Sequence, residues 1–325
     1  MPALLESGFF VRKPAWHGQG TVLAEYPGRD EAMRLAGHTF EVVEREVAIV
    51  ENGVVGSGPI AGWKALVRSD TSALLHVARD SYAVIQNTQP WDLLDAVLGQ
   101  EHVKYDTAGV LDQGAVLWVT ALVDEPSMIA HDPSPIFPFV AAWWSHDGSG
   151  ACTIDQTSVR RVCMNTHRAA SAEADRTGKT FTFRHVGAVG DRIAAARDVL
   201  AGVRTGFRAF IEVVEDLAAL SVSDAGIEAF VRAFLPMPPE HAISETVKGH
   251  VLDARKIVTA NLDGPTCEGI RNTAWGLACA ATEYLDYGRG FRSPRTLLNR
   301  TILKGDRAKD EVFALSRRTA EVYAK

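Results

Sequence analysis

The side chains best suited to gripping a charged ligand lie in the stretch of residues 156–170. Thr157 or Ser158 could cap a helix there, because a hydroxyl accepts hydrogen bonds from the free amides of a first turn. Small and apolar residues then recur every three or four positions and predict one packed face: Val159, Val162, Cys163, Thr166 and Ala170. Three polar residues at i, i+4 and i+7 would share the opposite face: Arg161, Asn165 and Arg168. Such a face suits phosphates or carboxylates, although an ordinary solvated surface helix has the same spacing.

The basic residues of the chain are concentrated in two stretches, although its formal net charge is −6. Residues 158–185 contain six Arg or Lys against two acidic residues, and residues 287–309 contain seven against one. This surplus fits an anionic partner such as nucleic-acid phosphate. It fits equally an oligomer in which acidic and basic surfaces of neighbouring copies meet.

Further cations lie near aromatic residues. Lys64 follows Trp63 and would share one strand face with Arg68, and the tail sequence Gly288-Arg-Gly-Phe-Arg292 places Phe291 between two arginines. A cationic groove with stacking aromatics is how single-stranded nucleic acid is held without sequence preference, although the tryptophans could equally be core residues. The candidate DNA-binding residues are therefore Lys64, Arg68, Arg160, Arg161, Asn165, Arg168, Arg289, Arg292 and Arg295.

Motifs for covalent chemistry are missing from the sequence. No Gly-x-Gly-x-x-Gly, P-loop or nucleophile elbow occurs, so we expect no enzyme and no cofactor. Cys163 and His167 have a helical i, i+4 spacing that could hold a metal, and Cys152 could join them. Because no Cys-x-x-Cys pair is present, we expect buried, reduced cysteines and no metal; a metal-dependent enzyme built on these three side chains stays an alternative.

The order of the predicted elements indicates an α+β fold with a mainly antiparallel sheet and helices on one face, followed by a helical C-terminal region. Strands are expected over 39–50, 62–68, 74–86, 103–111, 114–123, 136–145 and 151–155, with an Asn-Gly turn at residues 52–53. Helices are expected over 31–36, 88–99, 156–170, 193–217, 224–234, 243–261, 267–286 and from 306. We divide the chain into an irregular lead-in and oligomer contact (1–38), an α+β core (39–188) and a helical region with a basic tail (189–325).

No run of 18 apolar residues and no signal peptide is recognisable, so we expect no membrane association and place the protein in the cytoplasm. With 46% hydrophobic residues over 325 positions, the chain can bury a sizeable core.

Six short motifs, in order along most of the chain, resemble the phage/plasmid-like protein family, a domain of unknown function common in actinobacterial phages and conjugative plasmids. They are Trp16-His-Gly18, Tyr82-Ala-Val-Ile-Gln-Asn87, Tyr105-Asp-Thr-Ala-Gly109, His146-Asp-Gly-Ser149, Arg161-Val-Cys-Met-Asn-Thr166, and Thr273-Ala-Trp-Gly276 with Glu283-Tyr284. The family carries no assigned reaction, and its genetic setting implies DNA metabolism. The order of strands, helix, β-meander and helix is also similar to the core of phage single-strand annealing proteins of the RecT and Red-beta type.

The leading hypothesis is therefore ATP-independent binding and annealing of single-stranded DNA in phage recombination by a homo-oligomer, ring or filament. A host single-strand-binding protein is a further candidate partner. The alternative is a phage host-interaction or anti-defence protein, whose C-terminal helices bind another protein.

Overall fold

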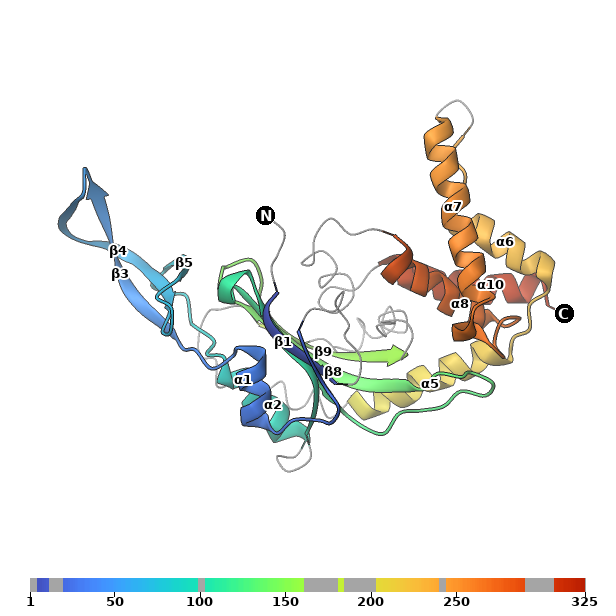
Figure 1. Cartoon of the computed structure of the whole chain (residues 1–325), viewed down its shortest axis with the longest axis horizontal. Helices are drawn as coiled ribbons and strands as arrows, with labels where there is room; N and C mark the ends of the chain where they lie inside the picture. The colour runs from blue at the N-terminus through green and yellow to red at the C-terminus, as the bar shows by residue number, and fades with distance from the viewer. Residues whose placement is uncertain are drawn as a thin grey trace. The chain divides into compact units, whose positions relative to one another are not determined.

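The computed structural model describes residues 5–11, 20–98, 103–160, 181–183, 203–239, 244–289 and 307–324. These residues form sheets in the N-terminal part of the chain and helices in the C-terminal part, which confirms the predicted α+β class (Figure 1). They fall into two compact units. Unit 1 holds the described residues up to Val123, those from Phe139 to Gln156 and Phe181–Phe183; unit 2 holds Asp124–Pro138, residues 157–160 and the helices from Arg204 onwards.

A three-stranded antiparallel sheet in unit 1 has the order β3-β4-β5. Its strands are β3 (Val42–Glu51), β4 (Val54–Arg68) and β5 (Leu74–Arg79). The predicted Asn-Gly turn joins β3 to β4, and Asn52 and Gly53 both have positive φ values, 54° and 81°, as a tight hairpin requires. Because β5 pairs only with Trp63–Val67 of β4, the far half of the hairpin is a two-stranded ribbon.

The second sheet has seven strands in the order β10-β9-β8-β7-β6-β1-β2. They are β1 (Leu5–Val11), β2 (Thr21–Leu23), β6 (Lys104–Leu111), β7 (Val116–Leu122), β8 (Ile136–Ser145), β9 (Cys152–Arg160) and β10 (Phe181–Phe183). The pairs β1–β6, β6–β7, β7–β8 and β9–β10 are antiparallel, and β1–β2 is parallel. The predicted meander is thus confirmed, and β8 has the predicted bounds.

Two sequence predictions about the seven-stranded sheet are wrong. The lead-in is not irregular throughout, because Phe9 and Phe10 are buried and β1 pairs along β6. No helix begins at Thr157 or Ser158, because β9 continues to Arg160; residues 161–170 of the expected helix lie outside the described residues. Cys152 and Ile154, at alternate positions of that strand, are buried in the core. The Thr157-Ser158 pair is therefore part of an extended strand rather than a helix cap.

Helices α1 (Arg29–Ala36) and α2 (Thr88–Leu98) pack in the same hydrophobic core as alternate residues of the seven-stranded sheet. The N-cap of α1 is Gly28, and Gly37 ends the helix with a φ of 75°. A buried histidine joins both layers: Trp91 Nε1 of α2 donates to His38 Nδ1 at 3.1 Å, so His38 Nε2 carries the proton and donates to Gly109 O of β6 at 2.8 Å. Burial lowers the pKa of His38 to about 4.

Unit 2 is built around the nearly wholly buried helix α8 (Ala274–Glu283), which continues into a π-helical turn, Tyr284–Gly288. Around it lie α5 (Val203–Ala219), α6 (Asp224–Phe234), α7 (Glu245–Leu262) and α10 (Arg307–Val322). Ser223, Ser244 and Thr273 cap α6, α7 and α8 with their hydroxyls. The expected start of α8 at residue 267 is wrong, because Pro265–Cys267 forms a 3-10 turn and Gly269 has a positive φ of 83°. Within the part of the chain that is described, no helix is long and apolar enough to cross a membrane.

Candidate nucleic-acid interface

The β3-β4-β5 sheet has two chemically different faces, and β4 shows both. Alternate residues of a strand point to opposite faces, so Lys64, Leu66 and Arg68 share one face, as predicted. Leu66 is fully buried, which makes this the inner face. Trp63, half-buried, points to the outer face.

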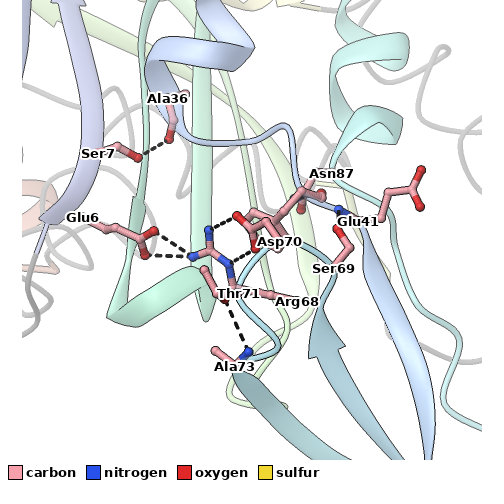
Figure 2. Close-up of polar contacts among 11 residues, drawn as sticks. Glu6, Ser7, Ala36, Glu41, Arg68, Ser69, Asp70, Thr71, Ala73 and Asn87 are labelled. Carbon is pink, nitrogen blue, oxygen red and sulfur yellow. Dashed lines mark hydrogen bonds and ion pairs between the residues drawn. The ribbon is translucent and has the colours of Figure 1, made fainter.

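Arg68 lies on the inner face, where its guanidinium is enclosed by two carboxylates (Figure 2). Nη1 donates to both oxygens of Glu6 at 2.8 and 2.9 Å, while Nε and Nη2 donate to Asp70 at 3.0 and 2.8 Å. The guanidinium carbon also lies 4.1 Å from the centre of the Phe40 ring. Arg68 therefore ties β1 to the loop that follows β4, and its donors already have partners.

The electrostatics agree with this structural role. The hydrogen bond to Asp70 is the largest cause that raises the pKa of Arg68, and the same bond lowers the pKa of Asp70. Both charges are thus stabilised by each other, and a phosphate would have to displace a carboxylate to reach Arg68.

Lys64 is likewise paired. Its Nζ lies 2.7 Å from Glu44 Oε1 on β3, and its side chain is only 14% exposed. The prediction that Lys64 and Arg68 share one face is confirmed. Both side chains form ion pairs with carboxylates, so we do not include them in the candidate interface.

The outer face presents two arginines around Trp63. Arg79 lies opposite Trp63 in the β4–β5 register, and its guanidinium carbon is 4.0 Å from the centre of the indole ring. Arg45 lies opposite Ala65 in the β3–β4 register, on the same face, and is exposed. Among the described residues neither arginine has a carboxylate partner: Arg45 donates only to the Glu44 carbonyl, and Arg79 only covers the indole.

This outer face combines the two features that single-stranded DNA needs, an aromatic platform and cations that can reach phosphate. Arg45 and Arg79 are not among the DNA-binding residues predicted from the sequence. Alternation of side chains could have grouped Trp63 with Ala65 and Val67, but only the strand register shows which arginines of β3 and β5 flank it.

The remaining predicted DNA-binding residues lie at the edges of the described structure or outside it. Arg160 ends β9, and nothing is described of its side chain. Arg289 follows the π-helical turn, and its backbone N–H donates to Tyr284 O at 3.0 Å. Five lie outside the described residues: Arg161, Asn165, Arg168, Arg292 and Arg295.

The predicted metal alternative finds no support in the parts of the chain that the structure covers, which hold no cluster of three potential ligands. Cys152 is fully buried among apolar side chains, and this burial raises the pKa of its thiol, so it stays protonated. Cys163 and His167 lie outside the described residues.

Taken together, the described residues define a mixed α+β protein with an aromatic and cationic sheet surface. A model for a family described as "Domain of unknown function (DUF932)" matches residues 74–304, and the chain belongs to this family. The match begins at β5 and therefore leaves β3 and β4 outside it. No curated protein and no solved structure matches the chain.

Proposed function

We propose that this protein binds single-stranded DNA and promotes annealing of complementary strands without ATP, as a homo-oligomer in phage-encoded recombination. The observation that carries the proposal is the Arg79–Trp63 pair on the outer face of the three-stranded sheet, with Arg45 beside it. Arg79 would turn from the indole to a phosphate, and a base would stack on the Trp63 ring in its place.

The order of elements gives further support. The three-stranded sheet is followed by α2 and then by the β6–β9 meander, which is the order on which the resemblance to phage annealing proteins rests. The chemistry needs no bond to be made or broken, because annealing only requires bases held exposed in a row.

A second candidate function, binding of a protein partner by the C-terminal helices, is favoured by a groove of about 930 Å³ between α6 and α7. Ile227, Val231 and Leu252 contribute apolar lining. Its charged rim is already paired within unit 2, as in the Arg232–Glu228 contact at 2.9 Å. A partner helix would have to bind chiefly through the apolar floor, so its affinity would change little with salt.

The test is fluorescence anisotropy of a labelled single-stranded oligonucleotide at two salt concentrations, with wild type, Trp63→Leu and Arg79→Ala. Replacing the indole should weaken binding by roughly 5- to 160-fold, since base stacking on one aromatic is worth about 1–3 kcal/mol. Removing the guanidinium should weaken binding and reduce the salt slope by about 0.7, the contribution of one phosphate on a single strand.

The matched control is Arg232→Ala, an exposed arginine of α6, which should bind like wild type. Absence of single-strand binding by wild type at low salt would refute the proposal. Salt-insensitive capture of a protein partner would then favour the second candidate.

A further inference from the structure

The edge of β3 that faces away from β4 has no partner strand among the described residues. Natural proteins keep edge strands short or protect them with lysine, proline or a covering segment, because open backbone groups attract another strand. β3 is ten residues long and stands at the edge of its sheet; charges protect its first half, at Glu44, Arg45 and Glu46, whereas Val47–Val50 carries no charge, lysine or proline. It pairs on its other side with β4 only.

Apolar side chains gather at the far end of the same hairpin. Ile49, Val50, Val54 and Val55 are 62–69% exposed. An isolated two-stranded ribbon is marginally stable in water, and this one has no described neighbour beyond the end of β5. Such an exposed apolar ribbon is typical of a surface that binds a partner.

The sequence of β3 indicates that a second β3 strand covers it, because the side chains on one face are complementary to the same face of an identical antiparallel strand. Arg45, Val47, Ile49 and Glu51 occupy alternate positions of β3 and so share a face, because the register shifts on either side of Ala48 insert their extra residues in β4. When an identical strand pairs antiparallel with this one, the acidic residue of each strand lies opposite the basic residue of the other, and apolar residues lie opposite apolar residues.

The matching register is centred on Ala48. With a two-fold axis at this residue, Arg45 faces Glu51 of the second copy, Val47 faces Ile49, and both contacts occur twice. An axis at Val47 would place Arg45 opposite Ile49, and an axis at Ile49 would place Glu51 opposite Val47. Neither alternative pairs any charge, and in the structure Glu51 has no cationic partner among the described residues.

We infer that β3 pairs antiparallel with β3 of a second copy of this chain about an axis at Ala48, joining two three-stranded sheets into one of six strands. Such an axis is perpendicular to the sheet and keeps corresponding faces on the same side. The Trp63 and Arg79 side chains of both copies would then line one surface. Binding of DNA along this joint surface rests on the proposed function, whereas the dimer does not depend on it.

The first test is a charge swap on the full chain without DNA, followed by sedimentation velocity over a concentration series. Glu51→Arg places two arginine pairs face to face, and Arg45→Glu places two glutamate pairs, so each should raise the dimer dissociation constant roughly tenfold or more. The double variant Arg45→Glu/Glu51→Arg restores both ion pairs and should dimerise like wild type.

The second test uses disulfide cross-linking to determine which residues of the two β3 strands lie opposite each other. Ala48→Cys brings two thiols together at the axis and should form an intermolecular disulfide on mild oxidation, whereas Val54→Cys, also exposed but on β4, should not. A monomeric wild type, a double variant that stays dissociated, or equal cross-linking at residues 48 and 54 would each overturn the inference. Because neither experiment contains DNA, these outcomes do not affect the proposal of single-stranded DNA binding, which has a separate test.

Discussion

Removing one partner of the buried Lys309–Asp286 ion pair should destabilise unit 2 strongly. Lys309 Nζ of α10 lies 2.6 Å from Asp286 Oδ1 of the π-helical turn, and both side chains are 2% exposed. Lys309→Met would leave a carboxylate in a site that water does not reach. Breaking such a pair typically costs about 3–5 kcal/mol, because the remaining charge keeps its desolvation penalty and loses its ion-pair partner on α10.

The matched control is Lys256→Met, which breaks an exposed pair of similar length. Lys256 Nζ lies 2.9 Å from Asp253 Oδ1, but the two side chains are 78% and 68% exposed. Solvent screens this pair, so its loss should change the free energy of unfolding by less than about 1 kcal/mol. The double variant Lys309→Met/Asp286→Leu removes both buried charges and should recover most of the lost stability.

Urea unfolding followed by far-UV circular dichroism, which is dominated by the helices of unit 2, measures these differences. The expected order of midpoints is wild type, Lys256→Met and the double variant close together, with Lys309→Met well below them. A Lys309→Met variant as stable as Lys256→Met would refute the assignment of a buried, mutually dependent pair.

Two further predictions concern the core of unit 1. Because burial lowers the pKa of folded His38 to about 4 from about 6.5, protonation favours the unfolded chain, and up to about 3 kcal/mol of stability should be lost as the pH falls from 6.5 to 4. His38→Gln should flatten that part of the stability–pH profile measured by urea unfolding, and an unchanged profile would contradict the reasoning. Gly109→Ala should lower stability by about 1–3 kcal/mol, because the new Cβ would lie 2.8 Å from Ser7 O and against the Trp118 ring, whereas Gly58→Ala meets nothing within 4 Å. Thermal unfolding of the two variants side by side checks this, and equal midpoints would refute it.

Local signals in the sequence predicted much of the fold. The Asn52-Gly53 turn needs two residues that tolerate positive φ, and these two residues supply that tolerance without help from the rest of the chain. Helix α6 has its predicted bounds because Ser223 caps it and its apolar positions have helical spacing.

Features that depend on distant residues could not be predicted in this way. Arg68 is held by Glu6, which lies 62 positions earlier, so the sequence shows a cation on a strand but not the carboxylates that enclose it. The end of β9 resembled a helix start because spacing alone does not show that Cys152 and Ile154 continue a meander into the core. Likewise, Arg79 and Trp63 are brought together only by the β4–β5 register.

The central claim is that the outer face of the β3-β4-β5 sheet holds single-stranded DNA for annealing. Its most direct test follows annealing of two complementary fluorescent oligonucleotides, without nucleotide, in the presence of wild type, Trp63→Leu/Arg79→Ala or Arg232→Ala. We expect wild type and Arg232→Ala to accelerate annealing equally, and the outer-face variant to lose the acceleration while keeping its fold. No acceleration by wild type, or full acceleration by the outer-face variant, would contradict the account.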